Sequence, residues 1–181
     1  LESSLFYFRF IFFVLGSLYV LKNSKDALKY FSYVLFFVFI IELLDGYFQF
    51  FFSFNIIGFP THESRLSILF SDELILGSYL SRLFPLMFVL SLISFKKSKI
   101  FLVILSTIII LIDILIYSTG ERTAFFYLLI GISLLIFMSN KFKLLRILTF
   151  IVSLSLITII SFNNERIHNR MISKTIEELI N

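Results

Sequence analysis

The chain has 181 residues, of which 59% are hydrophobic, and its mean hydropathy is +0.98. Soluble domains are about 45–50% apolar, so this composition excludes an ordinary soluble domain and predicts a membrane protein. The net charge of +4 does not indicate a nucleic-acid partner, because the lysines lie between apolar runs, and the absence of cysteine excludes disulfides and thiolate metal sites.

Six long apolar runs follow one another along the chain. They are of the length needed to cross a hydrocarbon core of about 30 Å. Inside a bilayer such runs must satisfy their own backbone hydrogen bonds, so they are predicted to be helices. The sequence therefore predicts an all-α, polytopic transmembrane bundle over residues 1–162. The predicted spans are 5–21, 30–52, 73–95, 100–117, 123–139 and 144–162.

Basic residues indicate the orientation of this bundle. Nine of the sixteen fall in three alternate loops. They are Lys22, Lys25 and Lys29, then Lys96, Lys97 and Lys99, then Lys141, Lys143 and Arg146. The positive-inside rule places these loops in the cytoplasm. The 53–72 loop, the 118–122 hinge and the 163–181 tail are then predicted to face outward.

The tail at 163–181 is polar and compatible with a helix. The chain also begins with Leu1 rather than Met. We therefore expect this sequence to be a fragment of a longer protein, with the tail as the start of a truncated outward segment. His62 in the 53–72 loop and His168 in the tail are interpreted as solvated side chains, with a role as general base as the alternative for each. No metal or cofactor is expected.

Five charged residues fall inside the predicted spans. They are Arg9, Glu42, Asp45, Arg82 and Asp113. In the predicted topology all five lie in the outer half of the membrane. Each costs at least about 2.5–3.5 kcal/mol in a bilayer without a partner or water, so we expect a polar cavity at this level. Glu42, Asp45 and Gln49 form its polar stripe on one helix. The alternative is that these charges form ion pairs that join helices.

The 118–122 hinge, Ser118-Thr119-Gly120-Glu121-Arg122, interrupts two apolar runs. Ser118 or Thr119 is suited to cap the helix that follows, whose first N–H groups would then face outward as an anion site. Arg122 and Glu121 lie at the same place. The alternative is that Gly120 forms a turn and Arg122 only marks the membrane interface.

The 70–85 segment predicts a closely packed helix. Gly77, Ser78 and Ser81 form a small face that permits close helix contact. Pro85 is expected to kink this helix just beyond Arg82. Close packing around a charge suits the wall of a pocket, although helix packing alone also explains the pattern.

Three stretches together resemble the O-antigen ligase and polymerase family of bacterial inner-membrane proteins. The first is Asp45-Gly46-Tyr47-Phe48-Gln49 with Asn55-Ile56-Ile57-Gly58. The second is Arg65-Leu66-Ser67, leading into Phe70-Ser71-Asp72-Glu73-Leu74-Ile75-Leu76-Gly77-Ser78-Tyr79-Leu80 and Pro85. The third is Ser118-Thr119-Gly120-Glu121-Arg122-Thr123-Ala124. The resemblance covers about residues 40–130 and depends on the order and spacing of these motifs.

The resemblance implies a metal-independent glycosyltransferase that acts on the periplasmic face. Its donor would be a polyprenyl-diphosphate-linked glycan, and its acceptor a glycan, a lipid or a protein. Arg65 and Arg122 would neutralise the diphosphate, and Arg82 would assist them, as preorganised cations meet the charge of a leaving group. Arg9, Glu42, Asp45, Gln49, Asp113 and Glu121 would support the polar cavity.

The chain also departs from the family. Members have more than six spans and a large outward loop with a histidine thought to act as the base. His168 is not equated with that histidine, so we expect the catalytic base to lie outside this sequence. Two other classes stay open. A transporter or flippase-like subunit would need polar residues through the inner halves of the spans, and a structural membrane subunit would pair its charges internally.

Overall fold

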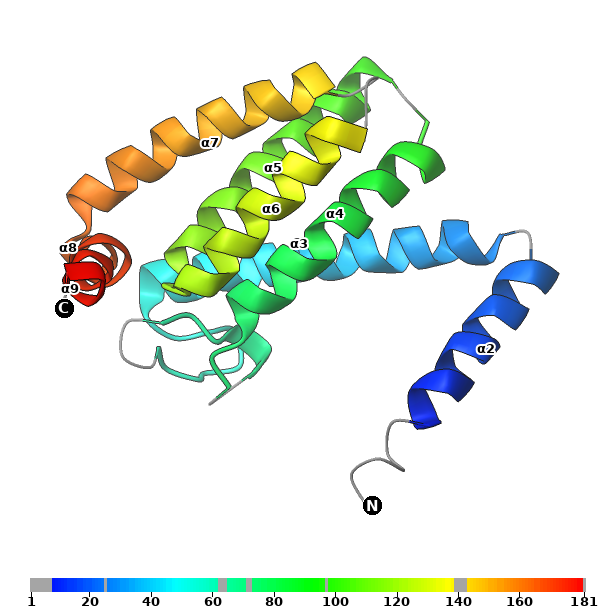
Figure 1. Ribbon diagram of the computed structural model, residues 1–181, viewed down its shortest axis with the longest axis horizontal. Helices are drawn as coiled ribbons and strands as arrows, with labels where there is room; N and C mark the ends of the chain where they lie inside the picture. The colour runs from blue at the N-terminus through cyan, green and yellow to red at the C-terminus, as the bar shows by residue number, and fades with distance from the viewer. Residues whose placement is uncertain are drawn as a thin grey trace.

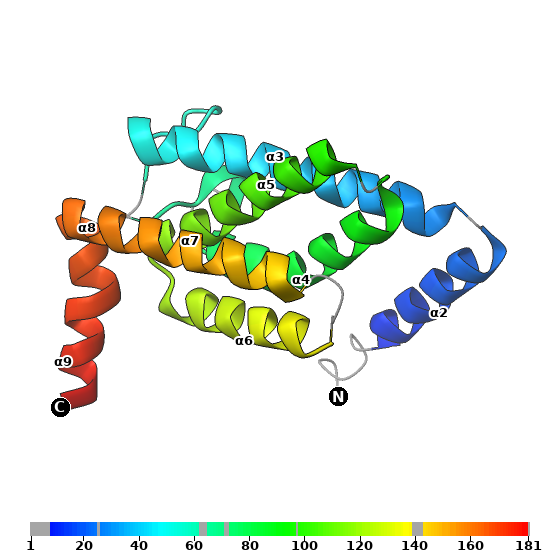
Figure 2. The ribbon, with the colours of Figure 1, turned by 90° about the horizontal axis from the view of Figure 1, so that it is seen from above.

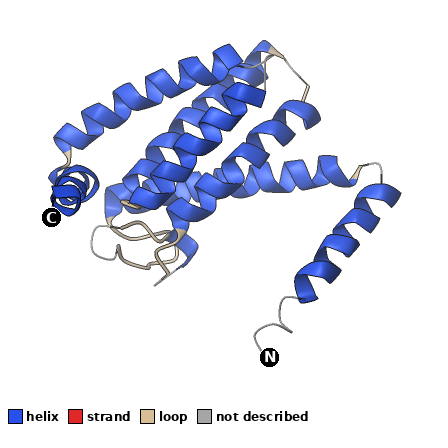
Figure 3. Cartoon of the chain, viewed as in Figure 1, coloured by secondary structure: helices blue, strands red, loops and turns tan. Residues whose placement is uncertain are grey.

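The computed structural model describes residues 8–24, 26–61, 65–70, 73–96, 98–138 and 143–180. Its regular structure is helical, with no strand drawn among the described residues (Figure 3). Phe54 and Pro60 form an isolated bridge. The helices are α2 (Phe8–Asn23), α3 (Ala27–Phe52), η1 (Ile68–Phe70), α4 (Leu76–Ser94), α5 (Lys99–Ser118), α6 (Arg122–Met138), α7 (Lys143–Asn163), α8 (Glu165–His168), the π-helix η2 (Asn169–Ser173) and α9 (Lys174–Ile180).

Each of the six predicted spans corresponds to one of the helices α2 to α7, with ends that differ by a few residues. Four of them, α3, α4, α5 and α7, are long and apolar enough to cross a membrane by length and composition. The chain is therefore consistent with a multi-pass membrane protein. Helix α6 is apolar but has only 17 residues, and α2 as described has 16. Six spans are thus not confirmed, and the full count stays a prediction.

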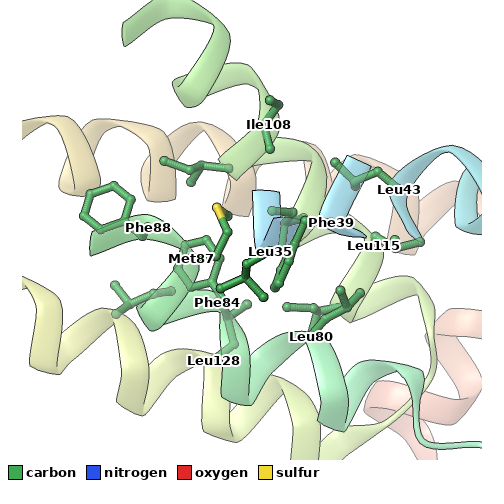
Figure 4. Close-up of a cluster of buried hydrophobic side chains, with 14 of the residues drawn as sticks. Leu35, Phe39, Leu43, Leu80, Phe84, Met87, Phe88, Ile108, Leu115 and Leu128 are labelled. Carbon is green, nitrogen blue, oxygen red and sulfur yellow. The ribbon is translucent and has the colours of Figure 1, made fainter. Parts of the chain in front are cut away.

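The core forms where α4 packs against α3, α5 and α6. Its side chains come from separate parts of the sequence: Phe39 from α3, Leu80 and Phe84 from α4, Leu115 from α5 and Leu128 from α6. Figure 4 shows these residues directed toward one another between the helices. All five are fully or almost fully buried. Other apolar side chains remain exposed on the outside of the bundle, as expected for a surface that faces lipid.

The bundle has two distinct ends (Figures 1 and 2). The hinge end holds the turn between α5 and α6, the described parts of the 53–70 loop, and the tail helices α8, η2 and α9. The lysine end holds the α2–α3 and α4–α5 connections. Helix α2 stands apart from the remainder of the bundle, and none of its residues is buried. The hinge end is therefore closely packed, whereas one side of the lysine end is open.

A buried ion pair joins α5 to α7. Arg146 donates two hydrogen bonds of 3.0 Å to the two carboxylate oxygens of Asp113, and Ser153 donates a third of 2.9 Å. The guanidinium of Arg146 also lies 4.7 Å from the ring centre of Phe84. Both charged residues are at most 1% exposed. From the sequence, Arg146 was predicted to lie with Lys141 and Lys143 in a cytoplasmic loop. That interpretation was wrong, because Arg146 lies in the first turn of α7 and points into the bundle.

Removing one partner of this pair is expected to destabilise the bundle. Arg146→Met leaves the carboxylate of Asp113 buried without its counter-ion, which typically costs about 3–5 kcal/mol. Lys143→Met, which removes an exposed cation one turn earlier on α7, should cost little. The double substitution Asp113→Leu with Arg146→Met should recover most of the loss, because it removes both charges. Reversible unfolding in mixed micelles measures the difference, and equal stability of the single and double variants would contradict this account.

Candidate anion-binding site

The hinge is a tight turn whose backbone is fixed by hydrogen bonds. Thr119 N–H donates to the carbonyl of Leu115, and Gly120 N–H donates to that of Tyr117. Gly120 has a φ of +71°, a left-handed conformation that glycine adopts at little cost. This glycine ends α5. Helix α6 then begins at Arg122, so Glu121 is the last residue of the turn.

The carboxylate of Glu121 caps a different helix, α4. Its Oε1 accepts a hydrogen bond of 2.8 Å from Gly77 N–H, and its Oε2 accepts from Ser78 N–H at 3.1 Å and Ser78 Oγ at 2.8 Å. These groups belong to the first turn of α4, where unpaired N–H groups and the helix dipole favour an anion. The hinge was expected to offer the N-terminus of α6 to an external anion. What the structure shows is that the hinge supplies an anion of its own to α4, and the anion site at the start of α6 stays a prediction.

Gly77 makes this cap possible, because the hinge passes directly over it. A Cβ added at Gly77 would lie 2.5 Å from Thr119 Oγ1, 2.9 Å from Ala124 Cβ and 3.2 Å from the carboxylate carbon of Glu121. The small face predicted on this helix therefore does allow close contact. Here it accepts both the hinge and the start of α6.

Arg65 reaches the hinge from the 53–70 loop. Its Nη2 donates to the carbonyl of Leu74 at 2.9 Å and lies 3.8 Å from Oε1 of Glu121. The Arg65 side chain is 21% exposed, so it borders solvent or headgroup. Its Nε is buried and has no hydrogen-bond partner among the described residues. Arg65 therefore lies beside the hinge and retains donor capacity, and its binding of a diphosphate stays a prediction.

The tail brings a further arginine to the same turn. Arg170, in η2, donates from Nε to the carbonyl of Gly120 at 3.0 Å. Arg122 in turn reaches the tail, with its Nη1 3.4 Å from Thr175 Oγ1. The sequence-based analysis missed Arg170, since the tail was interpreted only as a polar segment. Apolar residues beside it in the sequence could have indicated that the tail packs on the bundle, because Met171 and Ile167 are buried against α5 and α7.

Arg82 and Arg9 lie away from this turn. Arg82 is exposed on α4, and its guanidinium lies 5.3 Å from the ring centre of Tyr127 on α6. Arg9 lies on α2, where its guanidinium is 5.0 Å from the ring centre of Phe10. The structure thus brings Arg65 and Arg170 to the turn that precedes Arg122, whereas the ring contacts of Arg82 and Arg9 lie on α6 and on α2.

The polar stripe of α3 holds the 53–70 loop. Asp45 Oδ1 accepts from Ile56 N–H at 2.7 Å. Gln49 Oε1 accepts from Ser67 N–H and Ile68 N–H, each at 3.0 Å, and its Nε2 donates to the carbonyl of Phe59 at 3.3 Å. Ile68 has a φ of +50°, a strained conformation for a β-branched residue. Gln49 thus stabilises an unfavourable backbone near Arg65.

The remaining predicted cavity residues have separate surroundings. Glu42 and Asp45 are both buried, and each keeps one carboxylate oxygen without a hydrogen-bond partner among the described residues. Asp113 belongs to the ion pair with Arg146, not to the hinge. The predicted acids therefore do not form one cluster: Glu121 serves the hinge, Asp45 the loop and Asp113 the α5–α7 contact.

A short polar chain lies under the tail. The hydroxyl of Tyr117 donates to Ser161 Oγ at 3.0 Å, and Ser161 Oγ lies 3.5 Å from His168 Nδ1. A cavity of about 50 Å³ lies close by, between Ser53, Thr61, Leu66, Ser118 and Asn164. That volume admits water but not a diphosphate. His168 is half-buried at the end of this chain, whereas His62 lies outside the described residues.

Comparison with protein-family models, with curated proteins and with solved structures finds no match to this chain.

The fit of the hinge over Gly77 predicts the effect of one added methyl group. Gly77→Ala should destabilise the protein by about 1–3 kcal/mol, because Thr119 and Ala124 leave no room for a Cβ at position 77. Gly16→Ala on α2 is the matched control, since a Cβ there meets nothing within 4 Å. It should be neutral or stabilising by up to about 1 kcal/mol. Thermal unfolding of both variants in the same detergent compares them, and similar losses would contradict the close approach.

Proposed function

We propose that this chain is a membrane glycosyltransferase of the O-antigen ligase and polymerase type, whose hinge arginines bind the diphosphate of a polyprenyl-linked glycan. The supporting observation is that Arg65 and Arg170 both reach the α5–α6 turn, directly before Arg122. These arginines come from the loop, the tail and the hinge. Guanidinium groups are suited to phosphate because they offer several donors in a fixed plane and stay charged.

The location of these arginines suits a lipid-linked donor. They lie at the end of the membrane-length helices α4 and α5, where a diphosphate sits when its polyprenyl tail is in the bilayer. Under this proposal the hinge end faces the periplasm of a bacterial inner membrane and the lysine loops face the cytoplasm. Arg82, further along α4, would meet the donor at the edge of the bundle. The acceptor would be a glycan, a lipid or a protein.

The chemistry required of these residues is electrostatic. Transfer of the glycan breaks its bond to the diphosphate, which then leaves with its negative charge. Arg65 and Arg122 would hold that charge in place before and after the bond breaks. The backbone that carries them is held by hydrogen bonds: Glu121 joins the hinge to α4, and Gln49 holds the loop near Arg65. The proposal assigns no catalytic base to the described residues.

A structural membrane subunit is the second candidate, and specific contacts favour it. Asp113 is fully bonded to Arg146 and Ser153, and Glu121 is bonded to the first turn of α4. Under this alternative the hinge charges only fix helices. A transporter has no comparable observation in its favour.

Binding of polyprenyl diphosphate tests the proposal. The chain is reconstituted in nanodiscs, and its affinity for polyprenyl diphosphate is compared with that for the uncharged polyprenol. Arg65→Ala and Arg122→Ala should each weaken diphosphate binding by roughly tenfold or more, because a hydrogen bond to a charged group contributes about 1.5–3 kcal/mol. Polyprenol binding should not change.

Lys99→Ala is the control, because it removes an exposed cation at the lysine end. Helix content and thermal stability show whether each variant is folded. Arg122→Lys should recover part of the affinity, since it keeps the charge without the planar fork. If both arginine variants bind the diphosphate as wild type does, the site assignment fails. Glycan transfer in the native host, with Arg122→Ala introduced, then tests the reaction itself.

A further inference from the structure

A second feature lies at the lysine end, far from the hinge. Helix α2 is joined to α3 at one end and diverges from the bundle along its length (Figures 1 and 2). The space between α2, α3 and α4 is a groove of about 670 Å³. Its lining includes Gly16 and Val20 from α2, Phe31 from α3, and Leu86 and Leu90 from α4.

The groove is lined almost entirely by carbon. Ser17 is the one residue with a polar side chain among those that line it. Soluble proteins rarely expose a contiguous apolar surface of this kind. Here the groove runs beside α3 and α4, two of the helices long enough to cross a membrane. A hydrocarbon chain is the occupant that this lining and this position favour.

Charge at one end of the groove identifies the class of lipid. The groove reaches the α2–α3 turn at Leu21 and Ala27. Beside this turn, Lys22 lies in the last turn of α2 and Lys29 in the first turn of α3, and both side chains are exposed. Asp26, also exposed, is the opposing charge at the turn. Lysine attracts phosphate as a compact point charge, and basic residues beside membrane helices recruit anionic headgroups.

We propose that the groove between α2, α3 and α4 binds an acyl chain of an anionic phospholipid whose headgroup phosphate lies on Lys22 and Lys29. The lipid would complete the packing of α2, which buries no residue of its own against the bundle. This proposal concerns the lysine end and stands independently of the function proposed for the hinge.

Lipid retention tests the proposal. The chain is taken from vesicles made of equal parts phosphatidylcholine and phosphatidylglycerol, and native mass spectrometry identifies the lipids that remain bound. Wild type should retain phosphatidylglycerol in preference to phosphatidylcholine. The double variant Lys22→Gln with Lys29→Gln should lower this retention by about fivefold per lysine. Gly16→Leu should lower the retention of both lipids, because its side chain enters the groove.

The matched control is the double variant Lys96→Gln with Lys99→Gln. It removes two exposed lysines from the same end of the bundle without touching the groove. Gly16→Leu is expected to fold, because a Cβ at Gly16 meets nothing within 4 Å. Equal losses in the two lysine variants, or unchanged retention in the Lys22 and Lys29 variant, would overturn the proposal. So would a dimer in which a second copy covers α2.

Discussion

The contact on which the hinge end depends most is the carboxylate of Glu121 on the first turn of α4. Glu121 lies 44 positions from Gly77 in the sequence, yet its two oxygens take the N–H groups that α4 would otherwise leave unpaired. A buried carboxylate without such donors would be strongly unfavourable. The turn between α5 and α6, the start of α4 and the side chain of Arg65 are therefore fixed relative to one another.

This arrangement determines how an anion can approach the hinge. The N-terminus of α4 is already occupied by a carboxylate of the protein, so an external phosphate has to be met by side chains. Those around the turn are arginines from the loop, the hinge and the tail. The loop arginine is supported in turn by Gln49, which accepts two N–H groups of a strained segment. Asp45 and Gln49 thus hold the backbone of the loop that carries Arg65.

The fold was largely predictable from the sequence, because apolar runs of membrane length leave helices as almost the only option. Each of the six runs is a helix, although α2 and α6 are too short to establish six spans. The individual charges were less predictable. Arg146 stood three residues into an apolar run, with Thr149 and Ser153 on the same helix face, but its position beside Lys143 made it resemble a loop cation. The roles of Glu121 and Arg170 depend on contacts between distant segments, which hydropathy and spacing do not encode. Whether Arg65 and Arg122 bind a diphosphate stays a prediction.

The contacts of the tail with the hinge have a thermodynamic consequence. Arg170 donates to the carbonyl of Gly120, and Arg122 donates to Thr175 in α9, so both guanidinium groups join the tail to the hinge. A ligand that draws either arginine away from these partners weakens the attachment of the tail. By reciprocity, tighter docking of the tail lowers the affinity for the ligand by the same factor. Ligand binding at the turn and docking of α9 on the bundle are then thermodynamically coupled.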